Sequence, residues 1–176
     1  MKKIGIICCL LLMGCGITKN GVSEEKKTEL IQLIDSKNFK IVSHTAMPMA
    51  SIGMQQLANS NLLGVGNSAN SIDLTTNQNY FKVLNSDSLS VSLPFYGESR
   101  SISYSDNGAI TFEGIPNNVN LVFNESKNRY DGFYEFKTKN DFYKVTIQIY
   151  LNSKTRITVI SGKKSTITFL GVVQGI

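Results

Sequence analysis

From Ser71 to its C-terminus the chain is a succession of short β-forming runs separated by turn residues, and this pattern limits the possible folds more than any other feature. Breakers such as Asn85-Ser86-Asp87, Asp106-Asn107-Gly108 and Ser161-Gly162 separate the runs. A spacing of roughly 8 to 12 residues between such breakers is typical of antiparallel all-β folds. We expect strands near residues 71–75, 79–84, 88–93, 100–105, 109–113, 119–124, 129–137, 142–151, 155–160 and 165–173.

The clearest of these strands covers residues 143–151, where apolar and polar side chains alternate. One face carries Tyr143, Val145, Ile147, Ile149 and Leu151, and the other carries Lys144, Thr146, Gln148 and Tyr150. Such alternation indicates a sheet with one buried and one solvated face. The sequence therefore predicts a mainly β fold, α+β at the margin: an antiparallel meander barrel or sandwich of about 8–10 strands with one N-terminal helix packed on it. If the sheet closes into a barrel, it can be hollow or filled, and we expect its lining to include Val145, Ile147, Ile149, Phe169 and Tyr96.

A helix is expected ahead of the sheet. Ser23 is a good N-cap, Glu24 and Glu25 suit the first turn, and an apolar stripe follows at helical spacing, formed by Leu30, Ile31, Leu33 and Ile34. We expect this helix over residues 24–36, a strand over 39–46, and a long loop over 50–70 with room for one helical turn. Residues 23–176 are predicted to form a single β-rich domain.

The N-terminus has the pattern of a signal peptide. Lys2 and Lys3 precede an uncharged stretch from Ile4 to Met13, which is too short to span a bilayer. The sequence Leu12-Met13-Gly14-Cys15 resembles the lipobox of bacterial lipoproteins, in which the chain is cut before the cysteine and the thiol is acylated. This resemblance implies a signal peptide over residues 1–14, a lipidated Cys15 with a tether to residue 22, and attachment to a membrane of the cell envelope. A plain secretory signal and a short membrane anchor are the alternatives.

Residues 16–19 lack the acidic run associated with export of such lipoproteins to the cell surface. The periplasmic face is therefore the favoured location, and the cell surface stays open.

Cysteine use and charge exclude several classes of protein. All three cysteines lie at positions 8, 9 and 15, so the mature domain has no disulfide and no cysteine-based metal site. Removal of the two signal-peptide lysines lowers the formal charge from +5 to +3, and no basic stripe with interleaved aromatic residues is present. A nucleic-acid partner is therefore not expected.

The most individual segment is Leu93-Pro94-Phe95-Tyr96-Gly97, which follows the pair Tyr80-Phe81. Together with Tyr104, residues 108–114 and the stretches 161–164 and 167–171, it resembles the lipoprotein family catalogued as domain of unknown function 4251, found in Bacteroidota. The resemblance spans about residues 30–174, with one departure at Lys163-Lys164, where the family tends to have an Arg-Gln pair. It implies the β fold and the envelope location, and the family has no assigned activity.

Two interpretations of this segment remain open. Pro94 cannot donate a hydrogen bond to a sheet, so the segment can be a corner at which a strand leaves one sheet for another. Alternatively, the aromatic side chains of Tyr80, Phe95, Tyr96 and Tyr104 form the rim of a ligand-binding mouth.

Two further site hypotheses arise from short motifs. His44, Met47 and Met49, with Met54 beyond, offer one imidazole and several thioethers, a ligand set that suits Cu(I). Methionine is equally a flexible filler of protein cores. Asp87-Ser88-Leu89 fits an O-glycosylation sequon used on exported proteins of Bacteroidota, with Ser88 as the acceptor.

The sequence gives little support for catalysis. Ser23-x-x-Lys26 and Ser161-x-x-Lys164 match a string of penicillin-interacting enzymes, but the accompanying Lys-Thr-Gly strand is missing. His44 is the sole histidine, and among the carboxylates only Glu113 has a context that suggests burial. We expect a non-catalytic module, without a cofactor, that binds an apolar or glycan-like ligand or another envelope protein. A small periplasmic hydrolase and a copper-binding protein are the alternatives.

Overall fold

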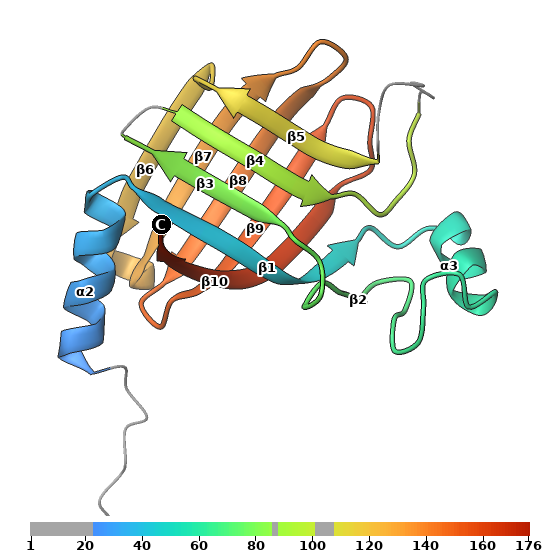
Figure 1. Ribbon diagram of the computed structural model, residues 1–176, viewed down its shortest axis with the longest axis horizontal. Helices are drawn as coiled ribbons and strands as arrows, with labels where there is room; N and C mark the ends of the chain where they lie inside the picture. Colours follow the sequence, from blue (N-terminus) through green and yellow to red (C-terminus); the bar gives the residue numbers. More distant parts are fainter. Residues whose placement is uncertain (1–22, 86–87, 101–107) are drawn as a thin grey trace, which may run out of the picture.

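The computed structural model describes residues 23–85, 88–100 and 108–176, which form one curled antiparallel sheet with a helix at each end (Figure 1). The strands follow the order β5-β4-β3-β1-β10-β9-β8-β7-β6, with the short β2 pairing with β1 beside this path. Their bounds are β1 Phe39–Pro48, β2 Ile72–Asp73, β3 Tyr80–Leu84, β4 Ser88–Pro94, β5 Ala109–Gly114, β6 Asn118–Asn124, β7 Arg129–Lys137, β8 Phe142–Tyr150, β9 Lys154–Ser161 and β10 Ile167–Gly175. The predicted mainly β, antiparallel fold is confirmed.

The sheet curls into a half-barrel, an architecture intermediate between the predicted barrel and the predicted sandwich. Its two ends, β5 and β6, are not hydrogen-bonded to each other among the described residues, so the ring stays open. Strands β3 to β5 lie across β7 and β8 (Figure 1), and aromatic side chains join the two halves. The rings of Phe81 and Tyr134 meet edge-on at 5.2 Å, and those of Phe112 and Phe136 stack at 4.5 Å.

The interior of the half-barrel is filled. In β8 the predicted alternation is confirmed, because Val145, Ile147 and Ile149 are only 0–1% exposed while Lys144 and Thr146 are exposed. Phe169 of β10 is 0% exposed as well. A void wide enough for a water molecule would leave the side chains that line it accessible, so these residues surround packed atoms and no ligand cavity.

Helix α2 (Glu24–Asp35) lies across one end of the half-barrel, beside the C-terminus of β10 (Figure 1). Ser23 caps the helix, since its side chain accepts a hydrogen bond from the backbone N–H of Lys26. Leu30 and Ile34 are buried against the sheet, and the hydroxyl of Tyr130 in β7 donates to Asp35 Oδ1 at 3.1 Å. The predicted packing of this helix on the sheet is therefore confirmed.

Strand β1 contains a bulge that decides which of its residues face outward. The pairing with β10 shifts register between Ser43 and Thr45, next to Gly171. Here the side chain of Asn79 makes the hydrogen bonds that a neighbouring strand would otherwise make. Its Oδ1 accepts from the backbone N–H of Ser43 at 2.9 Å, and its Nδ2 donates to the Ser43 carbonyl at 2.8 Å. The bulge leaves Ser43 buried and His44 exposed.

The structure corrects some of the expected boundaries. The predicted loop over residues 50–70 contains a two-turn helix, α3 (Ile52–Asn59), capped by Ser51 and held by the buried Met54. Strand β1 continues to Pro48 instead of ending at residue 46, because it pairs with β10 as far as Ile167. A short 3-10 helix, η1 (Glu125–Lys127), joins β6 to β7. Most of the strand predicted at 100–105 lies outside the described residues.

Neither α-helix of the described chain is long and apolar enough to cross a bilayer.

Candidate ligand-binding groove

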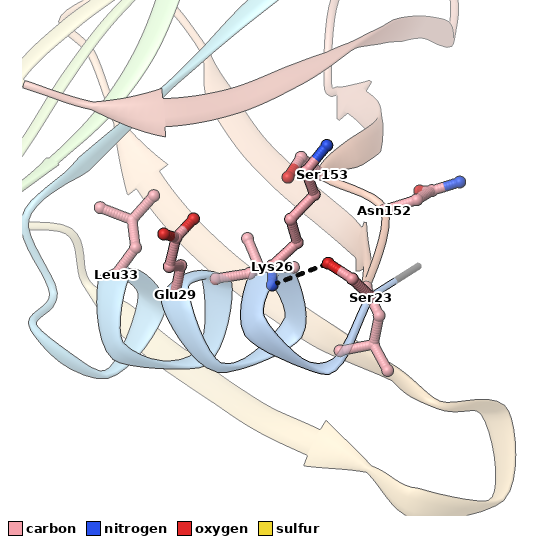
Figure 2. Close-up of a pocket in the computed structure, with 8 residues that line it drawn as sticks. Ser23, Lys26, Glu29, Leu33, Asn152 and Ser153 are labelled. Carbon is pink, nitrogen blue, oxygen red and sulfur yellow. Dashed lines mark hydrogen bonds between the residues drawn. The ribbon is translucent and has the colours of Figure 1, made fainter. Parts of the chain in front are cut away.

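A groove of about 700 Å³ lies between α2 and the turn that joins β8 to β9 (Figure 2). Leu30 and Leu33 of the helix and Leu151 of the turn give it an apolar floor. Lys26 and Glu29 project from α2 into it, and Asn152 and Ser153 border it on the other side. Its polar lining is completed by Ser23 at the helix cap.

The turn side of the groove is held in place by hydrogen bonds. Ser153 adopts a left-handed backbone conformation with φ of 64°, and its N–H donates to the carbonyl of Tyr150 at 2.9 Å. The Ser153 carbonyl accepts from the N–H of Val173 in β10 at 2.9 Å, which ties the turn to the neighbouring strand. The turn is therefore a fixed wall that faces the exposed charges of α2.

This lining combines a cation, a carboxylate, an amide and hydroxyls above an apolar floor. Such a set can exchange several hydrogen bonds with a polyhydroxylated ligand, and the volume lies within the range of small-molecule sites. Leucine side chains cover one face of the groove, so a ligand with one apolar and one polar face fits it better than a fully apolar chain.

The structure describes three of the four aromatic residues predicted to rim a mouth, Tyr80, Phe95 and Tyr96. Tyr80 lines a shallow depression of about 320 Å³ beside Ser90, Thr111 and Glu113, and the ammonium of Lys82 lies 4.2 Å from the centre of its ring. Phe95 and Tyr96 are half-buried and pack against the main core. Tyr104 lies outside the described residues.

The Leu93–Gly97 segment forms a strap to the β9–β10 connection. Pro94 ends β4 at the sheet rim, and residues 98–100 then pair with residues 163–165: the N–H of Ser165 donates to the Glu98 carbonyl at 2.9 Å and that of Arg100 to the Lys163 carbonyl at 2.7 Å. Lys164 is 6% exposed, with its ammonium 5.0 Å from the centre of the Phe95 ring. The strap crosses the end of the half-barrel opposite to α2.

The bulge in β1 places the predicted copper ligands on the outer surface. His44, Met47 and Met49 are all exposed, the two methionines by 37% and 59%. His44 lines one shallow groove and the methionines line another, and Arg156 borders both. Met54 is buried in the core, so it is not available to this set. The Cu(I) site stays a prediction, and the guanidinium group of Arg156 borders it.

The remaining predicted sites that the structure describes do not line the groove. Ser88, the predicted glycosylation acceptor, begins β4 and is half-buried, and Cys15 lies outside the described residues. Glu113, the one carboxylate whose context suggested burial, is exposed on β5. Ser161 accepts hydrogen bonds from the backbone N–H groups of Lys163 and Lys164 and donates to Asp141, which identifies the second Ser-x-x-Lys string as a turn.

Within the described ranges, two carboxyl groups have clearly shifted pKa values, and both are lowered. Hydrogen bonds from the N–H and hydroxyl of Thr75 lower the pKa of Asp73. Burial raises the pKa of Asp131, but hydrogen bonds from Arg129 and Asn124 outweigh it and the net shift is downward. A general acid that stays protonated near neutral pH needs the opposite shift.

No sequence pattern indicates the groove beside α2. The sequence marks Ser23 as a helix cap and Lys26 as the end of a Ser-x-x-Lys string, and it assigns no binding role to Asn152 or Ser153. These residues are more than 120 positions apart in the chain, and no spacing rule connects them. Only the position of α2 against the β8–β9 turn brings them together.

Comparisons with known proteins identify relatives of unknown role. The sequence model of a family described as a domain of unknown function (DUF4251) matches residues 22–173. A crystal structure of a DUF4251 family protein from Bacteroides eggerthii superposes with a TM-score of 0.56 at 10% sequence identity, covering 86% of this chain and 88% of that one. At this identity the superposition shows a shared fold. No curated protein matches the chain.

Proposed function

The chain belongs to the DUF4251 family, whose function is unknown, and from this premise we propose that it is a lipid-anchored cell-envelope protein with a non-catalytic domain that binds a glycan-like ligand in the groove beside α2. The observation that carries the proposal is the combination of a filled interior with an open, mixed-polarity groove at the end of the domain nearest the lipobox.

The anchor rests on the sequence before the domain. Lys2-Lys3, the uncharged stretch that follows and Leu12-Met13-Gly14-Cys15 together form the lipobox pattern. The described residues begin at Ser23, eight residues after Cys15. A fully extended chain of eight residues reaches at most about 28 Å. An acylated Cys15 would therefore keep α2 and its groove close to the membrane surface.

The ligand class rests on the lining of the groove. A carrier of apolar molecules needs a dry cavity, and the half-barrel interior is packed with side chains such as Phe81, Phe136 and Phe169, each 0% exposed. The groove beside α2 instead offers Lys26, Glu29 and Asn152 around leucine side chains. Sugars present hydroxyl groups at their edges and C–H groups on their faces, which complements this arrangement.

The anchor is tested by metabolic labelling of the full chain with radioactive palmitate. We expect label on the natural chain and none on Cys15→Ser, which should also accumulate as the uncleaved precursor. A wild-type chain that stays unlabelled and is recovered from the soluble cell interior would overturn the anchor without affecting the groove.

The ligand is tested on protein extracted from its own envelope. Native mass spectrometry should detect a co-purifying glycan, and soluble N-acetylglucosamine oligomers serve as the first defined probe for titration. Lys26→Ala with Glu29→Ala should reduce binding at least tenfold, whereas the matched pair Lys137→Ala with Glu113→Ala, both exposed and outside the groove, should leave it unchanged. Equal binding by both double variants would rule out the groove as the site.

A further inference from the structure

Strand β6 is an exposed sheet edge without the usual protection. Among the described residues it pairs with β7 alone, through seven consecutive residue pairs from Asn118–Glu135 to Asn124–Arg129 with no register shift. Natural edge strands are normally blocked by charges, prolines or bulges, because their free N–H and C=O groups pair readily with another chain. The sequence of β6, NVNLVFN, contains none of these.

The opposite edge of the same sheet differs. Strand β5 carries the exposed Glu113 and ends at Gly114, whose backbone has a φ of 140°. These features hinder the addition of a strand at β5. The contrast makes β6 the edge that can accept a partner.

The side chains of β6 are also unusually apolar for an exposed strand. Val119 is 42% exposed, Val122 51% and Phe123 40%. Leu121 packs over Gly132 of β7, and the ring of Phe123 meets that of Tyr130 edge-on at 5.1 Å. Val119, Leu121 and Phe123 therefore continue the core-facing side of the sheet to its rim, where nothing described covers them completely.

The sequence of β6 is complementary to itself in the antiparallel direction. When two copies are centred on Leu121, this residue lies opposite its own counterpart and Val119 lies opposite Phe123 of the other copy. Asn118 then faces Asn124, and Asn120 faces Val122. Apolar residues meet apolar residues on the inner face, and no like charges are brought together, which is the condition for favourable cross-strand pairs.

We propose that two copies of this chain associate through β6, antiparallel and centred on Leu121, so that their sheets join into one. The two-fold axis makes the interface isologous, with one surface used on both copies. The join satisfies the free backbone groups of both edges and covers the apolar rim formed by Val119, Leu121 and Phe123.

The proposed register is tested by disulfide crosslinking of the full chain in its native envelope. Residues directly opposite in antiparallel strands have Cβ atoms about 4.5–5.5 Å apart, close to the separation that a disulfide needs. Leu121→Cys should therefore give a crosslinked dimer under mild oxidation. Val119→Cys, on the same face, would lie roughly 14 Å from its counterpart after an offset of four residues, and should not. Equal yields from both variants, or no dimer from Leu121→Cys, would overturn the register.

A second pair of variants tests the association without altering the packed side chain of Leu121. In the proposed register, residue 120 of each copy faces residue 122 of the other. Asn120→Lys with Val122→Lys would therefore place lysines opposite each other twice, and we expect a monomer because like charges repel. Asn120→Asp with Val122→Lys would place an aspartate opposite a lysine, and we expect the dimer to persist. Both variants put a lysine beside Asp131 of β7, so they affect the isolated fold similarly at that position. Chemical crosslinking that finds the same oligomeric state for both variants would contradict the proposal.

Discussion

The side-chain amide of Asn79 is paired in both directions with the backbone of Ser43. Its Oδ1 accepts from the Ser43 N–H at 2.9 Å and its Nδ2 donates to the Ser43 carbonyl at 2.8 Å. Asn79 is 4% exposed and Ser43 is 1% exposed. A single side chain thus reproduces the two hydrogen bonds that a neighbouring strand would make, at the point where β1 bulges away from its regular pairing.

Replacing Asn79 with Leu should destabilise the domain strongly. The change leaves the buried N–H and C=O of Ser43 without partners, and each unsatisfied group costs about 1–3 kcal/mol. We expect a loss of about 2–5 kcal/mol in the free energy of unfolding, measured by urea denaturation. The neighbouring exposed variant Asn77→Leu serves as a control, with an effect within about 0.5 kcal/mol.

Gly171 should not tolerate any side chain. A Cβ there would collide with the Val42 carbonyl oxygen and lie 2.8 Å from Ser43 Cα, because the bulge brings the two backbones together. We expect Gly171→Ala to cost more than about 3 kcal/mol or to prevent accumulation of folded protein. Gly175→Ala in the same strand meets only Leu33 Cδ1 at 3.9 Å, so its thermal midpoint should stay close to that of the natural chain.

Stability should fall at alkaline pH through Tyr130. Burial, with added contributions from the charge of Asp35 and its hydrogen bond, raises the pKa of Tyr130 from 10.0 to about 12. Because the folded state holds this proton more tightly, the stabilisation is complete below pH 10 and is lost as the pH rises toward about 12. The expected contribution is about 1–2 kcal/mol.

Tyr130→Phe checks this pH dependence. The variant should lose the hydrogen bond to Asp35 and show a shallower decline of unfolding free energy above pH 10, while burial still raises the pKa of Tyr134. An identical alkaline slope in both proteins would contradict the assignment to Tyr130. Ultraviolet titration at the phenolate band gives an independent reading.

The stacked rings in the interior should account for much of the stability. Phe136 is 0% exposed and lies between the rings of Phe112 and Tyr143, at 4.5 and 5.3 Å. Phe136→Ala should therefore cost about 3–5 kcal/mol. Ile160→Ala, on the outer face of β9 with the side chain 50% exposed, should cost less than about 1 kcal/mol by the same denaturation measurement.

The second half of the sheet was predicted well from sequence because its signals are local. The run expected at 129–137 coincides with β7, and the expected limits of β8 and β9 differ by one residue at the ends. Alternating side chains in these strands face the core and solvent in turn, and residues such as Asn152 and Ser153 mark the reversal. Both signals act over a few positions, so the sequence displays them directly.

Other features depend on contacts between distant residues. Strand β1 lies between β3 and β10, and nothing near residue 39 reveals that its partner is the C-terminus. Helix α3 was expected to be mostly loop because its segment is rich in Ser, Asn and Gly, while the Ser51 cap and the burial of Met54 stabilise it. The groove beside α2 likewise depends on a helix and a turn that meet only in the folded chain.

The opening between β5 and β6 affects how the domain holds its curvature. A closed barrel has a radius fixed by its strand number and stagger, whatever lies inside. Here no ring of hydrogen bonds sets the radius, so the distance between the two halves depends on the side chains wedged between them, with Phe112 and Phe136 acting as spacers. Exchanging a few of these interior aromatic side chains during evolution can therefore widen or narrow the half-barrel. No backbone hydrogen bond of the sheet has to break for this change.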